Sequence, residues 1–229
     1  KGMKSEGEMV FWEKEIAGFA KKIGNDFFNL STPDYVTAER CWLWAASTGH
    51  MFAMYNLGVL YQDEKKDIDS AFEWYRKAAE AGFDVAMGVL GWLYSTEKKD
   101  MGLAIKWYRK AANAGNAYAM HNLGWFYSTE KQDINLAIKW YQKGAEAGFA
   151  PAMNNLGKLY YDGKKDITLA IEWLQKAAEA GDVTAMHNLG WFYETEKKEF
   201  ELAIKWYRKG AEAGHAPAMK NLGKFYYDE

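Results

Sequence analysis

The sequence predicts an all-α protein, a right-handed α-solenoid of stacked antiparallel helix pairs with a 33-residue repeat. Two observations lead to this fold class. An Ala-Met dipeptide recurs at a spacing of 33 residues without a slip, and each unit contains two segments whose apolar residues follow helical spacing. The dipeptide begins at Ala53, Ala86, Ala119, Ala152, Ala185 and Ala218. Because one helix pair of this length cannot bury both of its apolar stripes alone, neighbouring pairs must stack.

The first helix of each unit, here called helix A, carries Ala-Met followed by Leu-Gly and Tyr. In the first unit these are Ala53, Leu57, Gly58 and Tyr61. Counted from the alanine as zero, the positions +1, +4, +5 and +8 share one face of a helix. A glycine in the middle of a helix costs about 1 kcal/mol against alanine, so its recurrence needs a packing reason. We expect a bulky aromatic residue of the second helix to lie against it.

The second helix, helix B, carries Ala71, Trp74, Tyr75 and Ala78 at the spacing of an amphipathic helix. Either aromatic residue is a candidate for the glycine contact. A glycine such as Gly82 follows, at the position where a helix commonly ends in a residue with left-handed backbone conformation. We expect the helix-B tryptophans to belong to the core; they are Trp74, Trp107, Trp140, Trp173 and Trp206.

The repeat divides the chain into three parts within one domain. Residues 1–52 are expected to form degenerate capping helices, with helix-like patterns over 9–16 and 19–27. Residues 53–217 form five regular helix pairs. Residues 218–229 repeat only helix A, and we expect charge or a partner to cover its outer face.

These motifs resemble the Sel-1-like repeats, relatives of the tetratricopeptide repeat, over about residues 53–226. The shared pattern is Ala, Leu-Gly and Tyr in helix A, followed by Ala, Trp-Tyr, Ala-Ala and Gly in helix B. Family units usually join the two helices by a longer loop that contains glycine. Here the connection is a short charged run, for example 95–100, and we expect runs such as 64–67 and 97–100 to be solvated.

Composition narrows the classes of partner. With 29 basic and 31 acidic residues, the net charge of −2 offers no global field for nucleic acid, so a nucleic-acid partner is not expected. No apolar run is long enough to cross a membrane, which predicts a soluble chain without membrane insertion. The compartment is open: cytoplasmic, or periplasmic or secreted if an upstream signal was removed. A single cysteine, Cys41, excludes an internal disulfide.

Catalytic and cofactor motifs are absent from the sequence. No phosphate-binding loop, dinucleotide fingerprint, zinc-protease motif or nucleophile elbow occurs. Cys41 falls on the apolar face of a helix B, where we expect a core thiol. His121 and His187 stand two repeats apart, roughly 20 Å if each repeat adds a helix-packing distance of 9 to 10 Å, too far to share a metal. We therefore expect no enzyme, no metal, no cofactor and no small-molecule substrate.

The candidate binding residues lie on helix A, on the side that faces away from its core stripe. A solvated helix should carry Lys, Glu or Gln there, yet position +6 holds tryptophan in three repeats and lysine in two. Asparagine recurs at +3, and two histidines stand at +2. The candidates are Trp92, Trp125, Trp191, Lys158, Lys224, Asn122, Asn155, Asn188, Asn221, His121 and His187. We call this set the helix-A face.

The resemblance to tetratricopeptide relatives implies that this face lines a concave groove, in which asparagines hold the backbone of an extended peptide. Aromatic rings beside amides suit such a partner. The structural alternative is that the tryptophans pack between adjacent A helices and that the asparagines bridge repeats. Both interpretations stay open from the sequence.

Three functions are compatible with this pattern. The favoured one is a non-catalytic adaptor that binds a peptide or protein on the helix-A face. The alternative is a bacterial effector-neutralising or host-interaction factor that grips a folded protein, as implied by members of the resembling family. A groove enzyme acting on carbohydrate is weaker, because no paired carboxylate supports it.

Overall fold

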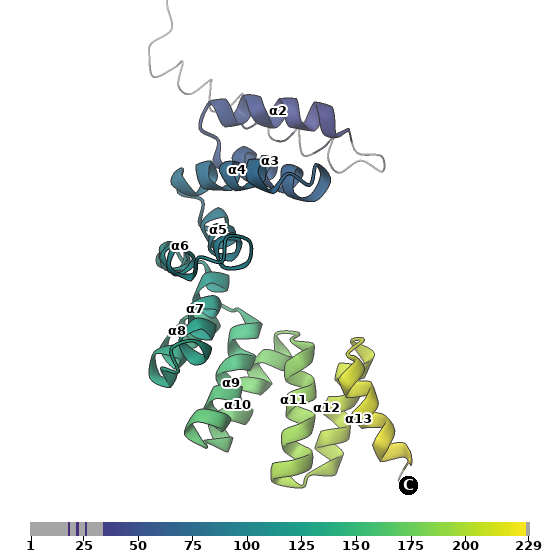
Figure 1. The fold of residues 1–229 in the computed structure, drawn as a ribbon. Helices are drawn as coiled ribbons and strands as arrows, with labels where there is room; N and C mark the ends of the chain where they lie inside the picture. The colour runs from purple at the N-terminus through teal and green to yellow at the C-terminus, as the bar shows by residue number, and fades with distance from the viewer. Residues whose placement is uncertain (1–17, 19–21, 23–25, 27–33, 228–229) are drawn as a thin grey trace, which may run out of the picture. The chain divides into compact units, whose positions relative to one another are not determined.

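The computed structural model describes residues 18, 22, 26 and 34–227, and all regular elements of 34–227 are helical (Figure 1). The helices predicted over 9–16 and 19–27 therefore lie outside the described residues, apart from Lys22 and Asp26. The A helices are α3 (Met51–Val59), α5 (Asp84–Thr96), α7 (Ala117–Thr129), α9 (Ala150–Lys164), α11 (Val183–Phe192) and α13 (Ala216–Tyr227). The B helices are α2 (Tyr35–Ser47), α4 (Ile68–Glu80), α6 (Met101–Asn113), α8 (Ile134–Glu146), α10 (Ile167–Glu179) and α12 (Phe200–Glu212). Short π-helical segments, η1 (Leu60–Glu64) and η2 (Tyr193–Lys197), extend α3 and α11.

The chain forms two compact units, Lys1–Ala114 and Gly115–Glu229. In the first unit, each described helix from α2 to α6 packs against the next one along the chain. The second unit repeats this order from α7 to α13, and its A helices also touch directly, α7 with α9 and α11 with α13. The predicted all-α arrangement of stacked antiparallel helix pairs is confirmed.

Side-chain caps and left-handed residues define where the helices begin and end. The carboxylate of Asp67 accepts a hydrogen bond from the backbone N–H of Ser70 (3.0 Å), and Asp100 does the same for Leu103 (2.9 Å). Both aspartates are exposed, as expected for the charged runs to which they belong, and they also act as N-caps. The glycines after the B helices have positive φ, for example 97° at Gly82, which confirms the predicted cap.

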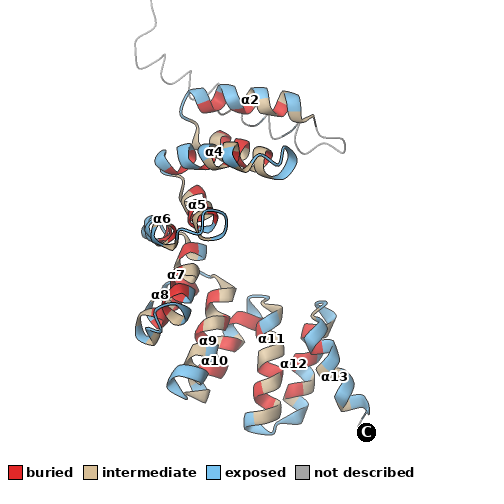
Figure 2. Cartoon of the chain, viewed as in Figure 1, coloured by how far each residue is buried: buried red, intermediate tan, exposed pale blue. Residues whose placement is uncertain are grey.

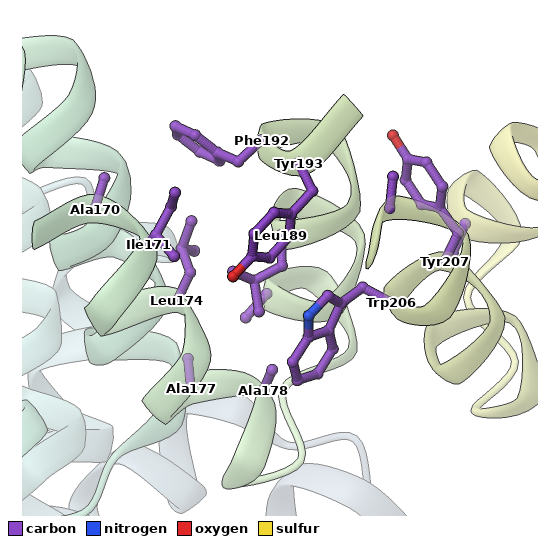
Figure 3. Close-up of a cluster of buried hydrophobic side chains, with 13 residues drawn as sticks. Ala170, Ile171, Leu174, Ala177, Ala178, Leu189, Phe192, Tyr193, Trp206 and Tyr207 are labelled. Carbon is purple, nitrogen blue, oxygen red and sulfur yellow. The ribbon is translucent and has the colours of Figure 1, made fainter. Parts of the chain in front are cut away.

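The cores of the pairs are built mainly from alanine and leucine, with a buried tyrosine of helix B in four of the five regular pairs. An ideal Cβ placed on Gly190 would lie 2.5 Å from the ring of Tyr207, so the missing side chain is what lets the ring lie on the backbone. The predicted aromatic contact is confirmed at four of the helix-A glycines, where the partner is a tyrosine; at Gly157 the prediction was wrong, because Leu174 takes the place of the ring. Figure 3 shows the corresponding cluster, in which Leu189 of α11 lies between Leu174 of α10 and the aromatic residues of α12.

The helix-B tryptophans differ from their prediction. Only Trp206 is buried; the other four are half-buried. Each carries the ammonium group of the lysine three residues later over its ring, at 4.0 Å for Lys77 on Trp74 and 4.6 Å for Lys209 on Trp206. The lysine stem and the cation cover the outer side of the ring. In Figure 2 the buried residues follow the sides on which the helices of a unit face each other. Among the described residues, no helix is both long and apolar enough to cross a membrane.

Candidate functional site

Two A helices carry exposed apolar stripes. On α7, Tyr118 and Trp125 stand seven residues apart and therefore share a face, and Trp125 is 42% exposed. On α5, Val85 and Trp92 have the same spacing, and Trp92 is 38% exposed. The prediction that large aromatic residues occupy the outward side of helix A is met at both tryptophans. We call the α7 pair, Tyr118 and Trp125, the α7 stripe.

Sequence reasoning missed Tyr118 and Val85. Both stand immediately before an Ala-Met dipeptide, and the same position in the first repeat holds Phe52, which is also exposed. The recurrence of an apolar residue directly before Ala-Met is visible in the sequence and indicates an apolar position on helix A. The sequence comparison did not find it because it covered only positions that follow the alanine.

Trp191 lies differently from Trp125, although it has the same place in its helix. Its ring makes an edge-to-face contact with Tyr161 of α9, with ring centroids 5.7 Å apart, and a second one with Phe192 at 5.0 Å. It is only half-buried, yet it packs against the core of α10–α12. At this position the structure shows packing between adjacent A helices, the arrangement that the sequence left open as the alternative.

The asparagines at +3 join neighbouring A helices of the second unit. The amide nitrogen Nδ2 lies within hydrogen-bond distance of a +2 side chain of the preceding A helix in three cases, each spanning 34 residues. The pairs are Asn155 with His121 Nε2 (2.9 Å), Asn188 with Asn154 Oδ1 (2.9 Å) and Asn221 with His187 Nε2 (3.2 Å). Asn122 instead donates to the backbone carbonyl of Tyr118 in its own helix (2.9 Å). One donor of each amide is thus already used within the chain.

The two histidines of this row are held neutral by their surroundings. Burial lowers the pKa of His121, whose ring packs against Tyr141 and Phe149 with centroids 5.6 and 5.4 Å away. Burial also lowers the pKa of His187, and the neighbouring His215, at 5.3 Å between centroids, adds to this. With Asn155 donating to Nε2, the neutral His121 carries its proton on Nδ1, a buried atom with no hydrogen-bond partner.

The cationic positions of the helix-A face are open. Lys158 on α9 and Lys224 on α13 both have exposed side chains. They hold the +6 place that tryptophan occupies on α7 and α11. Within the second unit, position +6 therefore offers an exposed ring, a cation, a packed ring and a second cation along the chain.

The remaining reactive side chains form no catalytic constellation in the part of the chain that the structure describes. Cys41 is half-buried, and no group of three or more His, Cys, Asp or Glu side chains there could hold a metal. Burial raises the pKa of Tyr75, and for Tyr207 a hydrogen bond to Glu194 acts with burial in the same direction. These phenols stay protonated at neutral pH. The arrangement offers rings, amides and ammonium groups, which are the means of binding a protein surface.

Comparisons with known proteins agree with the helix pattern. The family model described as Sel1 repeat matches residues 52–83, 85–116, 117–149, 150–182 and 183–215. A search of curated proteins finds no match. Among solved structures, a Sel1 repeat protein from Oxalobacter formigenes is 32% identical over 90% of this chain and 89% of its own, with a TM-score of 0.78.

Two further structures show the same fold. A protective antigen of uropathogenic Escherichia coli with an SLR fold is 28% identical, with a TM-score of 0.77; the match covers 96% of this chain and about half (52%) of that protein. The immunity protein Pa5087 of Pseudomonas aeruginosa is 19% identical over 88% of this chain and 83% of its own, with a TM-score of 0.59. At that identity the likeness concerns the fold alone.

Proposed function

The chain belongs to the Sel1 repeat family, and from this premise we propose that it is a non-catalytic scaffold that binds a protein or peptide partner on the helix-A face. Repeat folds of this type generally serve as protein-interaction scaffolds. The observation that carries the proposal is the α7 stripe: Tyr118 and Trp125 expose large rings on one face of the helix, about two turns apart, where a solvated helix needs none. Large rings that become buried on binding are typical energetic centres of interfaces.

The polar candidates refine which partner this face suits. Lys158 is exposed on the neighbouring helix α9, so a partner with apolar and acidic residues would complement both kinds of group. The asparagines and histidines, namely Asn122, Asn155, Asn188, Asn221, His121 and His187, keep a place in the proposed interface as its polar part. Since each amide already spends one donor within the chain, the rings and cations carry the main share of recognition.

A second candidate is a factor that neutralises an effector by gripping a folded protein. The structures with the same fold include immunity proteins of Pseudomonas aeruginosa, which makes this class worth testing. The engaged amides favour it over an extended peptide, because a folded partner needs fewer free backbone-binding groups. The two candidates differ in one measurable respect. A peptide-binding scaffold would still bind its partner after that partner has been unfolded, whereas a factor that grips a folded protein would not.

The test is capture of a partner from a lysate of the source organism by the immobilised protein. We expect Trp125→Ala to lose capture at least tenfold while its melting temperature stays within a few degrees of the parent protein. Phe200→Ala is the matched control, because Phe200 is also an exposed aromatic residue (51%, against 42% for Trp125) and lies outside the helix-A face. Undiminished capture by Trp125→Ala would refute this face. Equal losses in both variants would show nonspecific apolar adhesion.

A further inference from the structure

Helices α8 and α9 lie side by side in the second unit (Figure 1), and a cleft of about 670 Å³ opens between them. Its volume is in the range of pockets that hold a drug-sized ligand. Helix α9 contributes Tyr160 and Lys164 to the lining, and Asp166 stands directly before α10. The other lining residues share one face of α8 and are Asn135, Ile138, Lys139 and Gln142.

Two hydrogen bonds across the cleft leave donors available to a ligand. The ammonium group of Lys164 donates to Oδ1 of Asn135 (2.7 Å), so the amide NH2 group of Asn135 faces away from Lys164 and is able to donate. The hydroxyl of Tyr160 accepts a hydrogen bond from Nε2 of Gln142 (3.2 Å), so its own hydrogen is left to donate. Both walls of the cleft therefore suit a ligand that carries oxygen acceptors.

Both ammonium groups of the cleft flank the amide of Asn135. Lys164 donates to it, and Lys139 stands one helical turn further along α8 on the same face. Lys139 is exposed and has no ion pair within the part of the chain that the structure describes. The carboxylate of Asp166 caps α10, where it accepts a hydrogen bond from the backbone N–H of Leu169 (3.0 Å). Two ammonium groups against one carboxylate leave a positive charge unbalanced.

The corresponding junction of the first unit, between α4 and α5, supplies the negative charge from within the chain. Asp69 stands at the place of Asn135, and its carboxylate pairs with Lys98 at 3.1 Å. Beside this lysine, the ring of Phe72 makes an edge-to-face contact with Tyr94, with centroids 5.0 Å apart. The lysine of this junction thus has both an anion and an aromatic ring next to it.

The junction between α10 and α11 also carries carboxylates that the α8–α9 cleft lacks. Glu172 stands at the place of Lys139 and pairs with Lys176 at 2.8 Å. Glu196 precedes the lysine at the end of α11, whereas Gly163 has this place in α9. At three places around the α8–α9 cleft, a carboxylate found in another junction is therefore replaced by an uncharged or a cationic residue.

We propose that the α8–α9 cleft binds an acidic segment of a partner protein, with an aspartate or glutamate side chain between Lys139 and Lys164 and an apolar residue against Ile138. The ligand supplies the carboxylate that the other junctions supply themselves. A carboxylate matches the cleft better than a phosphate, because its single charge balances the excess, whereas a doubly charged phosphate would repel Asp166. None of the lining residues belongs to the helix-A face, so the site does not depend on the function proposed above.

The probe is the peptide Ala-Glu-Leu-Glu-Ala, acetylated at its N-terminus and amidated at its C-terminus so that the glutamates are its only charges. Binding to the full chain is followed in NMR spectra through the side-chain amide resonance of Gln142, which lines the cleft. We expect a saturable shift, with an affinity that falls as salt is added. The matched peptide Ala-Gln-Leu-Gln-Ala should bind at least tenfold more weakly, since it lacks the carboxylates.

Two variants copy the other junctions and should therefore fold, with an unchanged circular dichroism spectrum. Asn135→Asp introduces the carboxylate that Asp69 provides between α4 and α5, and Lys139→Glu introduces that of Glu172. We expect each variant to bind the acidic peptide at least tenfold more weakly than the parent protein. Lys197→Gln is the matched control, because Lys197 is exposed and has the place of Lys164 in the α10–α11 junction. It should bind like the parent protein.

Four results would overturn the proposal. The first is the absence of saturable binding, and the second is parent-like affinity of Asn135→Asp and Lys139→Glu, which would place the peptide elsewhere. The third is an equal loss in Lys197→Gln, which would reduce the effect to net charge. The fourth is tighter binding of inorganic phosphate than of the peptide. Trp125→Ala should bind the peptide like the parent protein, so a failure of this proposal and a failure of the helix-A face are distinguishable.

Discussion

Helix α7 and helix α11 with the first residue of η2 contain the same nine residues, from Ala119 to Tyr127 and from Ala185 to Tyr193, but present them differently. Both bury the leucine and glycine of the segment against a following tyrosine. Their tryptophans diverge: Trp125 is exposed, and Trp191 packs against Tyr161 of the preceding A helix. Contacts inside a helix pair are thus dictated by the repeat, whereas the outer face of helix A depends on which residues the neighbouring repeat supplies.

The largest expected difference between the two helices concerns the tryptophans. Trp191→Ala removes two edge-to-face contacts and should lower the free energy of unfolding by about 2 to 4 kcal/mol, below the range for a fully buried ring. Trp125→Ala should lower it by about 1 kcal/mol or less. Urea titrations followed by circular dichroism measure both. Equal losses would mean that Trp125 is also a packing residue.

The central glycines of α7 and α11, which lie under a tyrosine ring, should behave alike, and the corresponding glycine of α13 should differ. Gly124→Ala and Gly190→Ala each force a methyl group onto a tyrosine ring, and we expect each to destabilise the protein by about 1 to 3 kcal/mol. Gly223→Ala has open space around its Cβ and should stabilise the protein by roughly 0.5 to 1 kcal/mol through helix propensity. Denaturation midpoints of the three variants give the signs. A lower stability of Gly223→Ala than of the parent protein would show that another group packs against this glycine.

The asparagines at +3 should separate in the same way. Asn188→Ala removes the donor to Asn154, a side chain only 6% exposed, and should cost about 1 to 2 kcal/mol. Asn122→Ala loses only a bond to its own helix backbone, so its stability should stay within about 0.5 kcal/mol of the parent protein. Thermal melts of both variants test this. If Asn122→Ala proved the more damaging, its amide would have a partner that this account lacks.

The smallest expected effect is a dependence of stability on pH. The folded pKa values of His121 and His187 lie below the unfolded value of about 6.5, so the unfolded chain binds more protons as the pH falls through that value. Stability should therefore be fully present above about pH 6.5 and decrease toward pH 5, by an amount on the order of 1 kcal/mol. The double variant His121→Gln, His187→Gln should flatten this part of the profile. An unchanged slope would assign the loss to other groups.

Much of the fold could be predicted because its contacts recur with the period of the chain. In every regular pair the central glycine of helix A contacts the helix-B residue 17 positions later, as Gly58 contacts Tyr75. One observed spacing therefore predicts all five contacts. The choice between Trp74 and Tyr75 could not be made, because adjacent residues on one apolar stripe have almost the same helical angle. The lysine three residues after each tryptophan could have shown that the tryptophan, and not the tyrosine, lies on the outer side of helix B, because the lysine covers the tryptophan ring.

The outer face was harder to predict because its contacts join different repeats. Tyr161 and Trp191 are 30 residues apart, and Asn155 meets His121 over 34 residues. Helical periodicity within one segment carries no information about such pairs. Comparing residues at separations near 33 would have found the asparagine contacts, whereas the exposure of Trp125 follows from side chains that surround it in space.

The most direct test of the central claim measures how accessible Trp125 and Trp191 are to solvent in one sample. The protein is labelled with 5-fluorotryptophan, and the two ¹⁹F resonances are assigned from the Trp125→Phe and Trp191→Phe variants. On addition of a soluble paramagnetic agent, we expect strong broadening of the Trp125 resonance and weak broadening of the Trp191 resonance, with Tyr161→Ala making Trp191 accessible. Equal broadening in the parent protein, or no effect of Tyr161→Ala, would contradict the account.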